Sequence, residues 1–177
     1  KVLANHLGVD TTCAAFIAEV AYLAGLVTID ADDRILPTTQ FDIWLMQTPS
    51  AKWQSLVSHW LITSRLSGLV GKDESKNVAP LGPELDRVSA APIRKLTLRL
   101  LTENASAAPE FNSLTALAQW HMPAKRSNGI PTDYLQWTLR EAEWLGITGQ
   151  GVISKYGVEL LNGGDLVSIN EDLPKPV

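Results

Sequence analysis

The chain has a single cysteine, Cys13, among its 177 residues. One cysteine cannot form an intramolecular disulfide, so a disulfide-stapled fold is excluded and a reducing, cytoplasmic setting is expected. Long apolar runs are also missing, since none approaches the roughly 18 residues that a membrane span needs. The first twenty residues lack the basic start and apolar block of a secretory signal. Because the chain begins at Lys1 rather than Met, we expect it to be part of a longer protein.

An excess of positive charge is missing as well. Fifteen Lys and Arg residues face 19 Asp and Glu residues, which gives a formal net charge of −4. Bulk electrostatics therefore repels nucleic acid weakly, and any contact with DNA requires a local basic patch. Hydrophobic residues make up 45% of the chain and charged residues 19%. This balance is typical of a globular protein that buries a core.

The sequence also lacks the motifs of catalysis and metal binding. His6, His59 and His121 are scattered, and none has a second His or Cys at metal-ligand spacing. There is no G-x-S-x-G elbow around a serine and no GxxxxGK[ST] phosphate loop. The acidic run Asp30–Asp33 lacks the Gly and the distal Glu of a calcium loop, so we interpret it as a solvated turn. We predict that the chain is not an enzyme and uses no metal, no cofactor and no small-molecule substrate.

What the sequence does contain is a succession of amphipathic helices separated by glycine and proline. Asp10 or Thr11 is the expected N-cap of the first long helix, which Gly25 ends. Trp53 and Trp60 are seven residues apart on the apolar stripe of a later helix, which indicates core or domain–domain packing. Helical spacing predicts further helices over 41–45, 49–61, 92–101, 114–121 and 132–145, and the expected N-caps of the last two are Ser113 and Thr132.

Two short hairpins follow two of these helices. One pairs Leu26–Ile29 with Arg34–Leu36, and the other pairs 147–148 with 152–153 across a glycine-containing turn. The segments around them match as an internal repeat: Leu23 with Trp144, Gly25 with Gly146, Leu26 with Ile147, Leu36 with Ile153, and Leu45 with Leu161. The order of three helices and a hairpin over 92–161 is that of a winged helix. The first copy is incomplete at its N-terminus, because only two helices precede its hairpin.

The predicted fold is α+β and mainly α, with tandem winged-helix-like units that carry small β-hairpin wings. Residues 1–63 form the incomplete unit with its Trp-rich helices, and residues 64–91 form a connector rich in Gly, Pro, Ser and charge. Several leucines in the connector indicate that it is packed rather than free. Residues 92–169 form the winged-helix domain, with a last strand over 166–169, and residues 170–177 form a tail.

The phrases AYLAGLV, LPTTQFDIWL, AKWQSLVSHWL and LREAEWLGITGQGVIS carry a resemblance. They are similar to an actinobacterial family of helicase-associated proteins, with a helicase C-terminal-like domain and winged-helix repeats, in which such phrases recur in a nearly all-helical region outside any motor. The resemblance covers most of 16–161 and is weaker in the connector. It implies a helicase-associated, DNA-linked context, and it carries over no catalytic residue.

The surfaces that a winged helix normally presents to DNA are acidic in this sequence. The helix over 132–145 is expected to expose one cation against three carboxylates, with an outer side formed by Asp133, Gln136, Trp137, Arg140, Glu141 and Glu143. The helix of the first copy has no Lys or Arg, and its hairpin contains three Asp residues against Arg34. A phosphate backbone would meet net negative charge at both places. We therefore expect a non-catalytic module that docks to a protein partner or to neighbouring domains of a longer chain, with direct DNA binding as the alternative.

Direct DNA binding would use a basic patch outside the recognition helices. Its candidate residues are Arg94, Lys95, Arg99, Lys125 and Arg126, and Arg140 of the recognition helix is a further candidate for nucleic-acid binding. These cations are also compatible with a solvated helix face and a polar loop. Trp137 falls off the apolar stripe of its helix and is predicted as an interaction anchor, with packing against the connector as the alternative.

Overall fold

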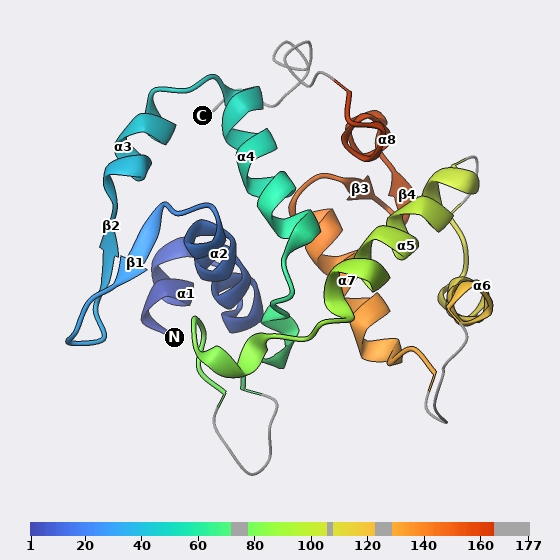
Figure 1. The fold of residues 1–177 in the computed structure, drawn as a ribbon, viewed down its shortest axis with the longest axis horizontal. Helices are drawn as coiled ribbons and strands as arrows, with labels where there is room; N and C mark the ends of the chain where they lie inside the picture. Colours follow the sequence, from blue (N-terminus) through green and yellow to red (C-terminus); the bar gives the residue numbers. More distant parts are fainter. Residues whose placement is uncertain (72–77, 106–107, 123–128, 165–177) are drawn as a thin grey trace.

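The protein is mainly helical, with two small antiparallel hairpins, in a computed structural model that describes residues 1–71, 78–105, 108–122 and 129–164 (Figure 1). This confirms the predicted α+β, mainly helical class. The N-terminal half contains α1 (Val2–Leu7), α2 (Thr11–Leu23), β1 (Val27–Ile29), β2 (Ile35–Pro37), α3 (Thr39–Leu45) and α4 (Pro49–Ile62). The C-terminal half contains α5 (Ala90–Glu103), α6 (Phe111–His121), α7 (Thr132–Trp144), β3 (Thr148–Gly149), β4 (Val152–Ile153) and α8 (Lys155–Asn162). Two short 3₁₀ turns lie between the halves, η1 (Ser67–Leu69) and η2 (Pro83–Leu85).

Side-chain caps fix the starts of three helices. The Asp10 carboxylate accepts hydrogen bonds from the backbone N–H groups of Thr12 and Cys13, at 2.7 and 2.9 Å, which satisfies two donors that the first turn of α2 leaves free. Thr48 caps α4 in the same way, next to a proline at the first helical position. Ser154 caps α8.

Four helix starts differ from the sequence prediction. Helix α3 begins at Thr39, two residues before the predicted start at 41. Helix α5 begins at Ala90, two residues before the predicted Pro92, and α6 begins at Phe111 rather than after a Ser113 cap. The expected N-cap Thr132 is instead the first residue of α7. Terminal turns are the least constrained part of a helix, so propensity alone places them only within a few residues. The strand predicted over 166–169 lies outside the described residues.

The internal repeat is visible in the backbone hydrogen bonds. Helices α2 and α7 have 13 residues each, and each is followed by a glycine with φ of 70°, Gly25 or Gly146. The next residue then bonds back into the helix, Leu26 N–H to Ala21 O and Ile147 N–H to Ala142 O, both at 2.9 Å. Only glycine adopts this left-handed conformation without strain. The two helix ends are therefore built in the same way, and α2 aligns with α7 at an offset of 121 residues.

The hairpins then return to the same place. Thr38 N–H bonds to Leu26 O, and Ser154 N–H bonds to Ile147 O. The two hydroxyls match as well, since Thr38 Oγ1 donates to Gly25 O and Ser154 Oγ donates to Gly146 O. Thr38 thus corresponds to Ser154, at an offset of 116 residues, and α3 corresponds to α8.

This register corrects one predicted pair. Pro37, not Leu36, is the counterpart of Ile153, because Pro37 directly precedes Thr38 and pairs with Val27 at the end of the hairpin. The first hairpin is longer than the second, which hides the register in the sequence. The predicted pair of Leu45 and Leu161 agrees with the offset of 116.

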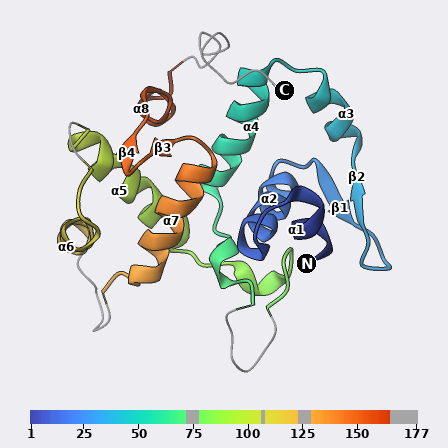
Figure 2. The ribbon, with the colours of Figure 1, turned by 180° about the vertical axis from the view of Figure 1, so that it is seen from behind.

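One hydrophobic core joins the two halves. It contains Phe16 and Val20 of α2, Trp60 of α4, and Leu100 of α5, among other residues of both halves. The connector closes on itself, since Leu66 N–H bonds to Leu85 O and both leucines are buried, as the sequence predicted. Helix α5 packs against both α4 and α7, and it crosses α7 in the views from the front and from behind (Figures 1 and 2).

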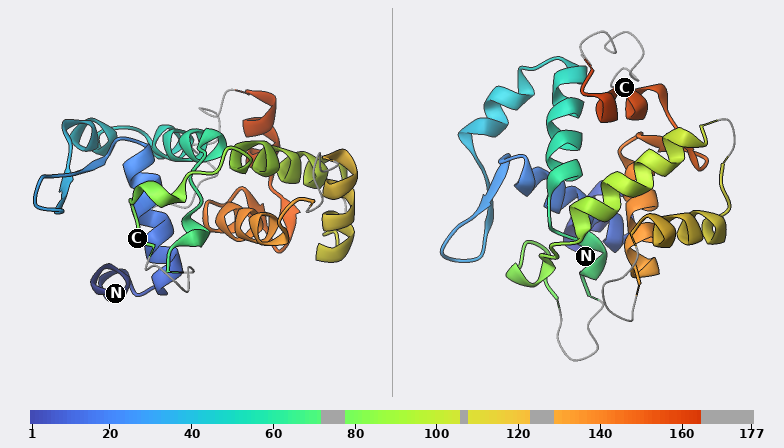
Figure 3. Two further views of the ribbon diagram at one scale, coloured as in Figure 1. Left: turned by 60° about the horizontal axis from the view of Figure 1, so that its bottom comes forward. Right: turned by 45° about the vertical axis from the view of Figure 1, so that its right-hand side comes forward.

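The β1–β2 hairpin and α3 lie at the edge of the molecule in both views of Figure 3. Helix α3 contains no buried residue, and neither strand of its hairpin does. In the C-terminal half, by contrast, Val158, Leu160 and Leu161 of α8 pack against the core.

Candidate interaction surfaces

The expected recognition helix of the second unit is turned inward. Trp137 is 3% exposed, stacks on Tyr134 with ring centroids 5.6 Å apart, and packs against Gly68 of η1. A Cβ on Gly68 would lie 2.2 Å from the Trp137 ring, so the connector approaches this tryptophan as closely as glycine permits. The prediction of Trp137 as an exposed anchor is therefore wrong, and the alternative of packing against the connector is correct.

Glu141, one turn further along α7, is also buried. Its two carboxylate oxygens accept hydrogen bonds from Trp60 Nε1 of α4, at 2.7 Å, and from Ser67 Oγ of η1, at 2.6 Å. Burial raises the pKa of Glu141, and the nearby Arg94 cation together with the Ser67 and Trp60 hydrogen bonds opposes that rise. The glutamate that was expected on a DNA-facing surface thus ties the second unit to α4 and to the connector.

Arg94 completes this buried cluster. Its guanidinium donates to the carbonyl oxygens of Thr63, at 2.8 Å, and Arg65, at 3.2 Å, and lies 4.9 Å from the centre of the Trp60 ring. Its side chain is fully buried. Burial lowers the pKa of Arg94, and Glu141 opposes this. Arg94 therefore cannot belong to a phosphate-contacting surface in this fold, which corrects its predicted role.

Helix α2 of the first unit is turned inward too. Its Glu19 is buried and forms an ion pair with Arg65 of the connector, at 2.7 Å, and also accepts a hydrogen bond from Leu81 N–H. Phe16 lies against Trp144 at the end of α7, with ring centroids 5.3 Å apart. Trp53 Nε1 of α4 donates to Leu145 O just beyond α7, at 2.6 Å. The tryptophan stripe of α4 thus packs between the halves, as its spacing predicted.

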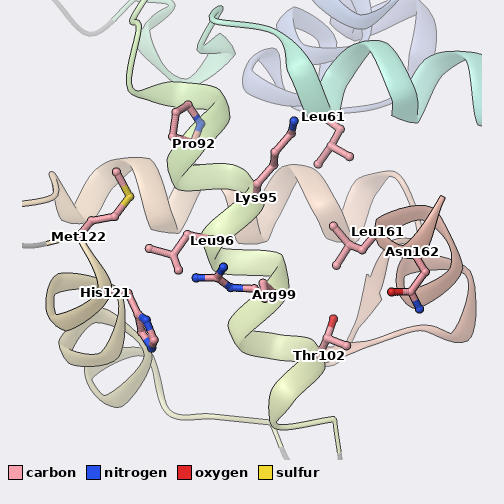
Figure 4. A pocket seen from close by; sticks show the side chains of 10 residues that line it. All are labelled: Leu61, Pro92, Lys95, Leu96, Arg99, Thr102, His121, Met122, Leu161 and Asn162. Atoms are coloured by element: carbon pink, nitrogen blue, oxygen red, sulfur yellow. The ribbon is translucent and has the colours of Figure 1, made fainter.

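A narrow basic strip on α5 remains exposed. Lys95 and Arg99 are one turn apart on the outer side of this helix, and Arg99 is paired with Glu103 at 3.8 Å. They border a groove of about 550 Å³ between α5, α6 and α8 (Figure 4). Its other lining residues are Leu61, Pro92, Leu96, Thr102, His121, Met122, Leu161 and Asn162. Two cations and a histidine around an apolar floor form a surface that suits an anionic partner.

The remaining predicted cations do not join this strip. Arg140 lies on α7 with its guanidinium 5.1 Å from the centre of the Trp144 ring, on the side that faces the first unit. Lys125 and Arg126 lie outside the described residues. Of the six predicted cations, the structure therefore brings Lys95 and Arg99 together and buries Arg94 away from them.

An apolar face dominates the first unit. Residues 1–46 carry eleven of the sixteen exposed large apolar side chains found among the described residues. On the hairpin and α3 these are Ile29, Ile35, Leu36, Ile43 and Leu45, and Met46 follows at 84% exposure. This face was not predicted, because the same residues fit the alternation and spacing of buried strands and helices.

A groove of about 340 Å³ lies beside this face. It is lined by Cys13, Phe16, Ile17, Val20 and Ala21 of α2, by Leu26, by Phe41 and Trp44 of α3, by Leu56 of α4, and by Trp144 and Leu145. None of these residues is charged. Burial in this apolar wall raises the pKa of the Cys13 thiol, with a smaller contribution from Asp10.

One exposed aromatic side chain was missed by sequence reasoning. Trp120 of α6 is 81% exposed, whereas Leu114 and Ala118 form the buried side of the same helix. In the sequence, the position of Trp120 off the helical stripe of Leu114 and Ala118 indicates that it is exposed.

In the part of the chain that the structure describes, no group of three His, Cys, Asp or Glu side chains is arranged to hold a metal ion. No described helix combines the length and the apolar character that crossing a bilayer requires.

Comparisons with known proteins complete the description of these surfaces. Neither the protein-family models, nor the curated proteins, nor the solved structures contain a significant match to this chain. The resemblance to helicase-associated proteins stays a prediction.

Proposed function

We propose that this chain is a non-catalytic interaction module, built from tandem winged-helix-like units, that docks a protein partner within a helicase-associated, DNA-processing assembly. The observation that carries the proposal is the apolar face of the first unit. Ile43, Leu45 and Met46 are about half exposed or more, next to an uncharged groove. A concentration of exposed apolar side chains is typical of interaction sites in globular proteins.

The orientation of the two recognition helices supports docking over base readout. A helix that reads the major groove must present several polar side chains to the base edges. Here Glu19 of α2 and Glu141 of α7 are buried in ion-pair and hydrogen-bond contacts within the chain. The polar side chains that α7 leaves exposed include Asp133, Gln136 and Glu143, two of which repel phosphate.

Site-specific photo-cross-linking in cells tests the proposal. A photoreactive amino acid at position 43 should yield a discrete adduct with a protein partner, and Leu45→Asp should abolish that adduct. A photoreactive amino acid at position 88, which is 94% exposed but lies on the connector, is the matched control and should yield none. If the wild-type sequence around position 43 gives no adduct, or if positions 43 and 88 give equal amounts of adduct, docking through the first unit is rejected.

A second candidate function is the binding of a polyanion such as duplex DNA along the basic strip. The observation in its favour is that Lys95 and Arg99 border the groove of Figure 4 with His121. The double variant Lys95→Ala, Arg99→Ala should reduce the slope of log K against log salt concentration by about two, since each neutralised phosphate contributes about 0.9. Arg34→Ala, which removes an exposed cation from the first unit, is the control and should leave the slope unchanged. If the wild-type protein and the Lys95→Ala, Arg99→Ala variant give the same electrophoretic shift, the basic strip is excluded as the DNA-binding surface.

A further inference from the structure

The internal repeat identifies what the first unit lacks. In the second unit, α5 packs against α7, β4 and α8, so it fills the space between the long helix, the hairpin and the last helix. The corresponding elements of the first unit are α2, β2 and α3. No described helix packs against all three in the same way, since the main helical neighbours of α2 are α1 and α4.

Burial at equivalent positions shows the consequence. Thr138 of α7 is 2% exposed and Ala142 is fully buried, whereas their counterparts Ile17 and Ala21 line the open groove, and Ile17 is 39% exposed. The residue types at the open positions are apolar. Removing the apolar surface of a side chain such as Ile17 from water lowers the free energy of the system. The groove is therefore an apolar site in the position that α5 occupies in the other unit.

The charge of the first unit restricts what can enter the groove. Residues 1–63 contain three Lys or Arg and six Asp or Glu, which gives 3 − 6 = −3, and the whole chain has a formal net charge of −4. Most of the net negative charge thus belongs to the first unit. Helix α5 is itself basic, with Arg94, Lys95 and Arg99 against a single acidic residue, Glu103. A basic amphipathic segment fits this site, because it combines an apolar stripe with charges of the opposite sign.

We infer that the groove between α2, α3 and α4 binds a basic amphipathic helix of a partner protein, in the place where α5 lies in the second unit. This inference rests on the proposed docking function and names the partner's chemistry. The contacts are of the helix-in-groove type, in which residues at i, i+3, i+4 and i+7 enter an apolar trough. Ile17, Phe41 and Trp44 form the walls that such residues would contact.

The single thiol of the chain makes the inference testable, because Cys13 lines the groove. The probe is a synthetic peptide with the sequence of residues 90–103, which is basic and amphipathic. Its binding is followed by fluorescence anisotropy of the labelled peptide and by the rate at which N-ethylmaleimide alkylates Cys13. At a peptide concentration ten times the dissociation constant, alkylation should slow about tenfold, in proportion to the fraction of empty groove.

Three controls sharpen the result. A scrambled peptide of the same composition, and a peptide with its three cations changed to glutamate, should neither bind nor protect Cys13. Ile17→Asp should abolish binding of the original peptide, whereas Ile62→Asp, at a position 63% exposed outside the groove, should not. Circular dichroism checks that both variants fold, and the two control peptides test the inference even if Ile17→Asp unfolds the chain.

The outcomes separate this inference from the proposed function. No binding of the original peptide, or equal binding of the scrambled one, overturns the helical occupant. If the photo-cross-link at position 43 persists in that case, docking stands and only the occupant is wrong. If alkylation of Cys13 instead slows as the protein itself is concentrated, without peptide, a second copy of the chain covers the groove, and the basic helix is rejected.

Discussion

The two repeat units share a backbone frame and differ in what covers it. Both run from a 13-residue helix through a left-handed glycine and a hairpin to a helix preceded by a hydroxyl residue, Thr38 or Ser154, that donates to the carbonyl oxygen of that glycine. In the second unit α5 lies over this frame and Ile153 is buried beneath it, whereas Ile147 and its counterpart Leu26 are buried in both units. In the first unit the counterpart of Ile153 is Pro37, which is exposed. Local hydrogen bonding therefore specifies the frame, and burial depends on whether a further helix packs on it.

The largest expected effect comes from breaking the buried cluster that joins the units. Glu141→Ala should lower the free energy of unfolding by about 3 kcal/mol or more, because it leaves the buried Arg94 cation without its counter-charge and leaves Trp60 Nε1 and Ser67 Oγ without an acceptor. Denaturant unfolding measures the change. Glu143→Ala, at an exposed position on the same helix, should change stability by less than about 0.5 kcal/mol. Similar effects for the two variants would contradict the buried cluster.

The contact between Gly68 and Trp137 should give the next largest effect. Gly68→Ala places a methyl group 2.2 Å from the indole ring, so we expect a loss of about 1–3 kcal/mol from overpacking. Gly149→Ala is the matched control, because no atom lies within 4 Å of its added Cβ. Thermal unfolding of both variants decides the point, and an unchanged midpoint for Gly68→Ala would mean that η1 does not press on α7.

The two helix-ending glycines test the repeat itself. Gly25→Ala and Gly146→Ala should each cost about 1–2 kcal/mol, since both residues have φ of 70° and an added Cβ meets no other atom within 4 Å. Conformational strain is then the main cost in both units, so the two losses should agree. A large cost at one glycine and none at the other would show that the helix ends are not equivalent.

Truncation of the equivalent residues Leu161 and Leu45 should show that α8 is packed against the core and that α3 is not. Leu161→Ala removes a side chain that packs against the core, and should cost about 1 kcal/mol more than Leu45→Ala, whose side chain is 49% exposed. Addition of the residue 90–103 peptide should stabilise the wild-type chain without altering this order. Equal costs in the absence of peptide would mean that the first unit is as well covered as the second.

The smallest effect is a dependence of stability on pH. Because the pKa of Glu141 is raised in the folded state, that state binds more protons than the unfolded state above the ordinary carboxyl value of about 4.3. The free energy of unfolding should therefore fall as pH rises through the raised pKa, by at most about 1.4 kcal/mol per pH unit. Glu141→Gln should lack this pH dependence. The free energy of unfolding of the wild type should therefore fall relative to that of the variant between pH 4.5 and pH 7. A difference that is constant over this range would show that Glu141 does not titrate there.

Several parts of the fold were predictable because they depend on neighbours in the sequence. Asp10 as a cap, Gly25 and Gly146 as helix ends, and both hairpins follow from hydrogen bonds that span a few residues. The connector leucines and the packing role of the tryptophans on α4 follow from spacing. The basic strip was predicted only in part, since Lys95 and Arg99 are one helical turn apart while Arg94 points inward.

Residue type and spacing thus determined the helices, their ends, the duplicated motif and the acidic character of the first unit. The tertiary structure alone decided that Trp137, Glu141 and Arg94 are buried and that Trp120, Ile43 and Met46 are exposed. The physical reason is that a helix of mixed composition has more than one face able to pack. Which face is buried depends on the path of the connector, which brings Ser67 and Gly68 onto α7, and no helix in the described ranges covers the first unit as α5 covers the second.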